Sequence, residues 1–231
     1  MINANALSRI KEKIYNSILV NNIPNHTVEI IAVTKTFPKE AIVSAFKEEI
    51  LNIGENKIQE AEFKFPKLPD LPKLKKRLIG HLQSNKVNKA VNLFDAIDTI
   101  DSKKIAQKLN NSLNRINQKK EVMLQVNTSG DDAKYGFDMI DEEKLLEVIS
   151  YKQLVVKGLM TIGEFTSDET KTRKTFVMLR QLKDKLNGQL QNEKKLTDLS
   201  MGMSSDYDIA IEEGSTQIRL GTALFGSRKW A

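Results

Sequence analysis

The apolar positions of this chain follow two alternating periods. Leu7, Ile10, Ile14 and Ile18 recur at helical spacing and predict an amphipathic helix over residues 4–20. A short run rich in β-branched residues then predicts a buried strand over 28–34. Further short apolar runs predict seven more strands, at 50–56, 77–82, 94–102, 121–127, 154–163, 196–204 and 216–226.

Helical patterns separate these strand patterns. Apolar residues at helical spacing predict helices near 41–46, 58–65, 84–94, 105–116, 145–149, 176–186 and 206–214, with a last helix after 226. Asp101 or Ser102 is expected to cap the helix that begins near Ile105. Residues 65–77 hold three of the five prolines and predict a surface loop, and 128–137 predict a polar loop.

Eight strands that alternate with helices predict parallel pairing, because each connection must cross back over the sheet. Eight such units favour an α/β fold that is one (β/α)8 TIM barrel, with an extra N-terminal helix and a single domain over residues 1–231. The competing fold is an open, doubly wound sheet. No Gly-x-Gly-x-x-Gly motif follows any predicted strand, which argues against a dinucleotide-binding sheet.

Composition narrows the class of protein. The 231 residues are 40% hydrophobic, yet no run approaches the roughly 18 apolar residues of a membrane span, and the charged N-terminus is unlike a secretory signal. The absence of cysteine removes disulfides and thiolate chemistry and suits a cytoplasmic location. We expect no metal site. The net charge of +6 permits nucleic-acid binding, but the lysines are scattered and aromatics are only 6%, so we expect a basic surface without a nucleic-acid partner.

Reactive side chains of such barrels lie at the carboxyl ends of the strands. The predicted ends carry Lys35, Asn56, His81 and Met160. A lysine at a strand end is usually just solvated, but in a partly dehydrated barrel mouth its amine becomes nucleophilic toward carbonyls.

The last two strand ends predict a phosphate site. Gly202 and Ser204 precede one predicted helix, and Gly221 and Thr222 precede the next. Glycine allows close approach to the backbone, the first amides of a helix are unpaired donors, and barrels often bind phosphate between these two loops. Each motif alone is better explained as an ordinary helix cap, but the two together on adjacent loops favour a phosphate site.

A phosphate site opposite Lys35 predicts a Schiff base with a phosphorylated carbonyl compound, which is either pyridoxal 5′-phosphate (PLP) or a sugar phosphate. Arg219 lies two residues before Gly221. Its guanidinium either donates to a pyridine nitrogen or pairs with a carboxylate inside the barrel.

Several segments together resemble a known family. "IIAVTKTFPKEAI", "NIGENKIQEA", "RLIGHLQSNK", "VKGLMTIG" and "LSMGMSSDYDIAIEEGSTQIRLGTALFG" are similar, in this order, to the pyridoxal phosphate homeostasis proteins, which are related to the N-terminal barrel of alanine racemase. The resemblance implies a fold-type III PLP barrel in which Lys35 forms the Schiff base. It implies a PLP site formed by Lys35, Asn56, His81, Met160, Met203, Ser204, Arg219, Gly221 and Thr222.

One loop departs from the family pattern. The family usually has a Glu-Ser-Lys-like run before a glycine, whereas Asp131, Asp132 and Ala133 precede Lys134 here. The resemblance therefore assigns no role to the loop 128–137.

The resemblance implies a monomeric, cytoplasmic protein that holds PLP and delivers it to apo-enzymes, without established catalysis. Two arguments support a carrier. The chain ends at Ala231, directly after the eighth unit, so we expect no further domain to supply the second base of a racemase. An arginine also keeps its proton beside the ring nitrogen, which leaves PLP a weaker electron sink. The alternatives are a weak PLP-dependent amino-acid racemase or lyase, and a Schiff-base aldolase acting on sugar phosphates.

Overall fold

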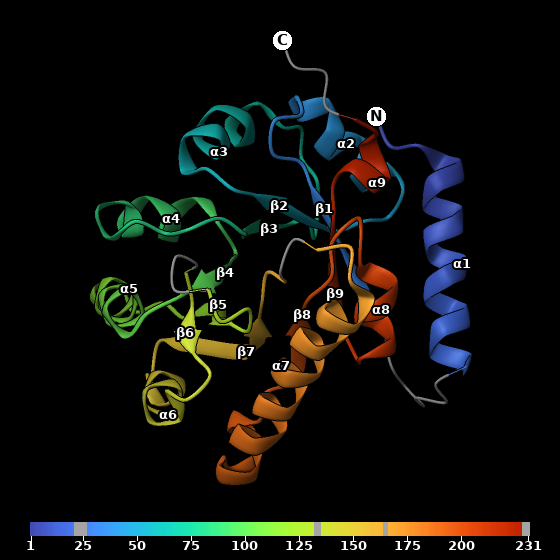
Figure 1. The fold of residues 1–231 in the computed structure, drawn as a ribbon. Helices are drawn as coiled ribbons and strands as arrows, with labels where there is room; N and C mark the ends of the chain where they lie inside the picture. Colours follow the sequence, from blue (N-terminus) through green and yellow to red (C-terminus); the bar gives the residue numbers. More distant parts are fainter. Residues whose placement is uncertain (21–26, 132–134, 164–165, 228–231) are drawn as a thin grey trace.

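The computed structural model describes residues 1–20, 27–131, 135–163 and 166–227. Within these residues the chain forms a closed parallel barrel with helices around it (Figure 1). The sheet has nine strands in the order β4-β3-β2-β1-β9-β8-β7-β5-β6, and β4 also pairs with β5. That pairing closes a ring of eight strands, which confirms the predicted (β/α)8 barrel.

The strands are short, and every pair is parallel. Their bounds are β1 Glu29–Val33, β2 Asn52–Glu55, β3 Lys75–Leu78, β4 Ala96–Ile100, β5 Lys120–Asn127, β6 Phe137–Asp138, β7 Leu154–Met160, β8 Asp198–Ser200 and β9 Gln217–Leu220. β6 pairs only with β5 and lies outside the ring.

Helices occupy most of the connections between barrel strands. Their bounds are α1 Ala4–Val20, α2 Lys39–Lys47, α3 Ile58–Lys64, α4 Val87–Leu93, α5 Lys103–Arg115, α6 Glu142–Ser150, α7 Glu169–Gln189, α8 Tyr207–Glu212 and α9 Thr222–Phe225. Three single 3₁₀ turns add to these, η1 Phe65–Lys67, η2 Ser84–Lys86 and η3 Asn192–Lys194. No helix among the described residues combines the length and apolar character needed to cross a bilayer.

The extra helix α1 packs against α8 and α9, on the side where the first and last strands meet (Figure 1). Its buried residues Leu7 and Ile10 contribute to the hydrophobic core, as their helical spacing predicts. The amide of Asn3 donates to the oxygen of Leu224 over 2.9 Å and ties the start of α1 to α9.

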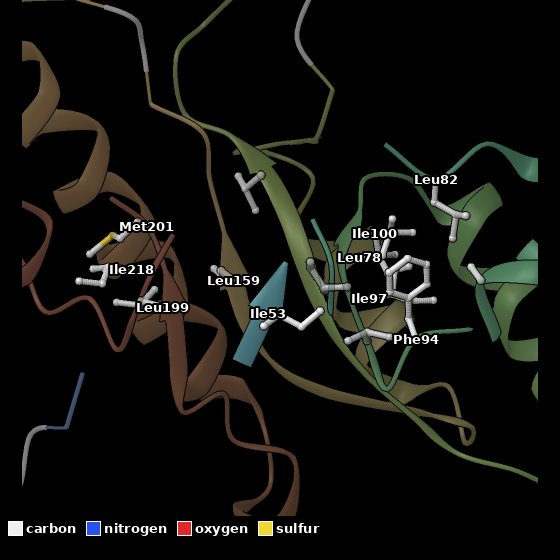
Figure 2. Packing of buried hydrophobic residues seen from close by; sticks show 14 of the residues in the cluster. Ile53, Leu78, Leu82, Phe94, Ile97, Ile100, Leu159, Leu199, Met201 and Ile218 are labelled. Atoms are coloured by element: carbon white, nitrogen blue, oxygen red, sulfur yellow. The ribbon is translucent and has the colours of Figure 1, made fainter. Parts of the chain in front are cut away.

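The apolar core lies mainly between the strands and the helices. Successive side chains of a strand point to opposite faces, so one set in each strand faces the helices and the other faces the barrel interior. Ile53, Leu78 and Ile97 belong to the helix-facing set and are completely buried (Figure 2).

The lower barrel interior is polar, because the inward positions of several strands carry charged side chains. Arg77 is fully buried and pairs with both oxygens of Asp98, with Nε–Oδ2 and Nη2–Oδ1 distances of 2.8 and 2.9 Å. Its Nη1 also lies 3.2 Å from a carboxylate oxygen of Glu121. Burial of these charges is tolerated because they are paired and hydrogen-bonded.

Some predicted boundaries differ from the structure. β3 begins at Lys75, inside the segment predicted to be a loop, and ends at Leu78 rather than near residue 82. Ser102, not Asp101, caps α5, since its hydroxyl accepts from the amide of Ile105. The loop predicted over 128–137 contains the start of β6, and its residues 132–134 lie outside the described part of the chain.

Candidate cofactor site

A cavity of about 340 Å³ opens at the carboxyl ends of the strands. Its lining residues are Val33, Lys35, Asn56, Ile79, Ile162, Met203, Ser204, Ser205, Arg219, Gly221 and Thr222. Seven of the nine residues predicted for the cofactor site therefore lie around one cavity, including Lys35 and the two loops near Ser204 and Gly221.

Lys35 enters the cavity because it continues the inward-facing set of β1. Val33, two residues earlier, lines the same cavity. The strand ladder runs one residue beyond β1, where the amide of Thr34 donates to the oxygen of Gly54 over 3.0 Å. The alternation of β1 thus carries over to Lys35, whose side chain is half-buried.

The loop after β8 is shaped by Gly202, which has a φ of 93°. A Cβ at this position would lie 2.6 Å from the Cβ of Ala210, so the loop needs glycine for both its conformation and its packing. The carboxylate of Asp206 then accepts from the amide of Met203 over 2.6 Å. Burial raises the pKa of Asp206, although this hydrogen bond acts in the opposite direction.

The two loops predicted to bind phosphate meet at Ser204. Its hydroxyl oxygen accepts from the amides of Gly221 and Ala223 over 3.3 and 3.1 Å. These amides point at one oxygen, and the Ser204 proton remains available to a further acceptor. A Cβ on Gly221 would make only ordinary contacts with Val33, at 3.6 Å or more, so the protein itself leaves room there that a side chain would fill.

Arg219 lies beneath the cavity with its guanidinium tied to the backbone. Nη1 donates to the oxygen and hydroxyl of Ser200 over 2.8 and 2.9 Å, and Nη2 donates to the oxygen of Thr161 over 2.7 Å. Of the two roles considered for Arg219, direct pairing with a carboxylate does not occur among the described residues. Burial lowers the pKa of Arg219 to about 10, while the charges of Asp98 and Asp206 act to raise it.

His81 and Met160, both predicted for the site, do not line the cavity. His81 is close to the carboxylate of Asp101, with an Nδ1–Oδ2 distance of 2.6 Å, and its ring stacks on that of Tyr135 with centroids 3.9 Å apart. Met160 is completely buried. Contact of these two residues with a cofactor stays a prediction.

Three apolar residues of the lining were missed. Val33, Ile79 and Ile162 each lie at or just after the end of a strand and form the cavity's apolar wall. Their apolar character is indistinguishable from that of core residues in the sequence, and only their position at a strand end could have identified them.

The chemistry of the lining suits a flat molecule with an anionic end and a carbonyl group. The hydroxyl proton of Ser204 provides a donor for the anion, the Arg219 guanidinium provides a cation, and Lys35 provides an amine. The volume is at the lower end of the roughly 300–1,000 Å³ typical of ligand pockets. PLP has these features, so the residues present fit that cofactor.

Comparisons with known sequences identify relatives of this chain. The profile described as "Alanine racemase, N-terminal domain" matches residues 11–229. The human pyridoxal phosphate homeostasis protein is 35% identical over 98% of this chain and 86% of its own length. The protein of that name from Aquifex aeolicus is 34% identical over 97% of both chains.

Solved structures give the same relationship. PipY of Synechococcus elongatus, solved without PLP, is 36% identical and superposes with a TM-score of 0.86 over 96% of this chain and 99% of its own. A second PipY structure, described as having PLP bound, is 37% identical, with a TM-score of 0.81 over 92% of this chain and 100% of its own. Alanine racemase of Clostridium difficile shares the fold, at 18% identity and a TM-score of 0.73 over 98% of this chain and 59% of its own. The identity and coverage together show that the chain belongs to the pyridoxal phosphate homeostasis protein family.

Proposed function

We propose that this protein binds PLP as a Schiff base on Lys35 and contributes to PLP homeostasis in the cytoplasm by holding the cofactor and delivering it to apo-enzymes. The observation that carries the proposal is that Lys35, Ser204 and Gly221 line one cavity. A ligand in that cavity is then within reach of an amine and of phosphate-binding donors at the same time.

The two ends of the cavity would bind different groups of the cofactor. The Ser204 hydroxyl would hold the phosphate by donating its proton, while the amides of Gly221 and Ala223 fix its oxygen in place, and Thr222 lines the cavity beside it. The Lys35 amine would condense with the aldehyde of the cofactor, so that a reversible C=N bond replaces the C=O bond and the oxygen leaves as water. Asn56 and Met203 would hold the ring, together with the apolar wall of Val33, Ile79 and Ile162.

Arg219 favours retention over catalysis. Its pKa of about 10 keeps the guanidinium charged at neutral pH, so it donates a hydrogen bond to the ring nitrogen but does not transfer a proton to it. When bound, PLP supplies an electron sink whose strength depends on protonation of this nitrogen. We infer that the site captures the aldehyde and does little to stabilise a carbanion.

The test is an absorbance spectrum of purified protein after incubation with PLP and dialysis. We expect a band at about 420 nm that is retained through dialysis. Borohydride reduction and mass analysis should place the added mass on the peptide that contains Lys35. Lys35→Ala should lose both signals, whereas the control variant Lys39→Ala, four residues along the chain, should keep both.

A wild type that acquires no such band, or a Lys35→Ala variant that keeps it while circular dichroism shows a folded barrel, would refute the Schiff base on Lys35. Catalysis is tested separately, by α-proton exchange of free amino acids in deuterated solvent. Rapid exchange at the PLP-loaded site would favour a racemase or lyase over a carrier.

A further inference from the structure

Behind the cavity, on the helix-facing side of β1 and β2, lies a buried lysine. The side chain of Lys64, in the last residue of α3, is only 6% exposed. Its ammonium donates to the oxygen of Thr34 over 2.8 Å, to Oε1 of Glu55 over 2.9 Å and to Oε1 of Glu60 over 2.6 Å. A buried ammonium is costly unless it is paired and hydrogen-bonded, and all three protons of Lys64 are used here.

This group, which we call the Lys64 network (Lys64, Glu55, Glu60 and Thr34), holds the backbone on both sides of Lys35. Before Lys35, the oxygen of Thr34 accepts from Lys64, and the hydroxyl of Thr34 donates to Glu55 over 2.7 Å. After Lys35, the amide of Thr36 donates to Glu60 Oε1 over 2.6 Å. The network therefore binds both neighbours of Lys35 from the side of the barrel wall opposite the cavity.

The backbone held in this way is a strained turn. The amide of Phe37 donates to the oxygen of Thr34 over 3.1 Å, which closes a four-residue turn with Lys35 and Thr36 at its centre. Thr36 has a φ of 64°, a value that type II turns require at this position and that glycine or asparagine usually provides. For a β-branched residue this conformation is unfavourable, so surrounding contacts must maintain it.

Lys64 is the cation that holds the network together. Both Glu55 and Glu60 contact the ammonium through one oxygen, so their carboxylates lie close to one another. The second oxygen of Glu55, Oε2, is buried and has no hydrogen-bond partner among the described residues. Without Lys64, two carboxylates and the Thr34 oxygen would lose their shared donor, and Glu60 would no longer be held beside the Thr36 amide.

We propose that Lys64 is a positioning residue for Lys35, which acts through Glu60 and Thr34 to hold the strained turn that directs the Lys35 amine into the cavity. This inference rests on the proposed function, since it concerns the amine that forms the Schiff base. Lys64 itself is not among the residues that line the cavity. It acts on the rate at which the amine reacts and leaves the phosphate-binding loops unchanged.

The test measures two properties of Lys64→Met separately, the rate of Schiff-base formation and the affinity for a ligand that cannot form a Schiff base. The rate of Schiff-base formation with PLP is followed by stopped-flow absorbance. Binding without reaction is measured with pyridoxine 5′-phosphate, which carries an alcohol in place of the aldehyde. We expect Lys64→Met to react about tenfold more slowly and to bind pyridoxine 5′-phosphate within about twofold of the wild type.

The matched control is Lys89→Met. Lys89 of α4 forms an exposed ion pair with Glu62, which lies in α3 as Lys64 does, with an Nζ–Oε1 distance of 2.7 Å. This variant removes an ammonium from a neighbouring pair without touching the turn, and both measurements should equal those of the wild type.

A second variant, Glu60→Ala, removes the acceptor of the Thr36 amide together with one of the three acceptors of the Lys64 ammonium, and serves if Lys64→Met fails to fold. It should slow the reaction as Lys64→Met does, and the double variant should be no slower than the slower single variant, because the contact between Glu60 and the Thr36 amide is lost in both. In protein without PLP, hydrogen exchange of the Thr36 amide should be faster in either variant.

Two results would overturn the inference while leaving the proposed function intact. One is a reaction rate equal to that of the wild type in a folded variant. The other is a parallel loss of pyridoxine 5′-phosphate affinity, which would give the network a purely structural role. A wild type that forms no Schiff base with PLP refutes the proposed function, and this inference with it.

Discussion

The guanidinium of Arg219 donates to the main-chain oxygen of Thr161 over 2.7 Å and so reaches from β9 past β8 to the end of β7. Its other amino group is held by Ser200 at the end of β8. The position of the charge is thereby set by three neighbouring strands before any ligand binds, and no rearrangement is needed to present it to the cavity.

Arg219→Gln should change the spectrum of the PLP complex without abolishing it. The amine of Lys35 is untouched, but loss of the guanidinium removes the permanent donor and makes the ring nitrogen easier to protonate. Titration of the absorbance against pH checks this expectation, with Arg115→Gln on the exposed surface of α5 as the control. An unchanged spectrum and affinity would leave Arg219 with a structural role alone.

Ser204→Ala should weaken retention of PLP by about 1–2 kcal/mol, the usual effect of losing a hydrogen bond to a charged group. The variant loses the hydroxyl whose oxygen also accepts hydrogen bonds from the amides of Gly221 and Ala223. The dissociation rate of PLP during dialysis measures the effect. Ser112→Ala, which removes an exposed hydroxyl on α5, should release PLP at the wild-type rate, and an equal rate for Ser204→Ala would exclude the phosphate contact.

Asp98→Asn should destabilise the protein by about 3–5 kcal/mol, because Arg77 loses its fully buried charge partner and keeps only the longer pair with Glu121. Arg77 and Asp98 have no exposed side-chain surface and share two hydrogen bonds. Urea unfolding gives the free energy of unfolding. Glu62→Gln, which breaks an exposed ion pair, should change it by less than about 1 kcal/mol, and a similar small value for Asp98→Asn would contradict the expectation.

Asp198→Asn should stabilise the protein more at neutral than at acidic pH. Burial raises the pKa of Asp198 above its ordinary value of 3.8. The folded protein therefore binds this proton more tightly than the unfolded chain does, and the wild type loses stability as the pH rises from 3.8 through the raised pKa. Asparagine has no such titration, so the gain in unfolding free energy should be larger at about pH 7 than at about pH 4.

Urea midpoints of the wild type and Asp198→Asn at both pH values check this prediction. Asp184→Asn, at an exposed position of α7, is the matched variant. A gain of equal size at both pH values would show that Asp198 titrates alike in the folded and unfolded chain.

Hydrophobic patterning predicted the order of the barrel elements, because helix and strand periods differ and the helix-facing side of the strands is mostly apolar. It misplaced β3, whose first residues are Lys75 and Lys76. These lysines pair in register with Asn52 and Ile53 of β2, a tertiary contact with no apolar signature. Arg77 inside the barrel is likewise unpredictable from one strand, since its partner Asp98 belongs to the next.

The lining of the cavity was predictable where chemistry and position coincide, as at Lys35, Ser204 and Gly221, which follow strand ends and line one cavity. Lys64 was not. Lysines in helical patterns usually face solvent, whereas the carboxylates that allow this one to be buried come from both β2 and α3. Such a group depends on how a helix packs on a strand, which periodicity does not describe.

The ring is completed where β1 pairs with β9, from Glu29 opposite Gln217 to Ala32 opposite Leu220. Lys35 precedes Gly221 in the chain and is therefore synthesised well before it. A nascent chain cannot hold one small molecule at both points until its final strand has docked. Tight retention of PLP would therefore report that folding is complete. Fragments that lack β9 should not retain the cofactor.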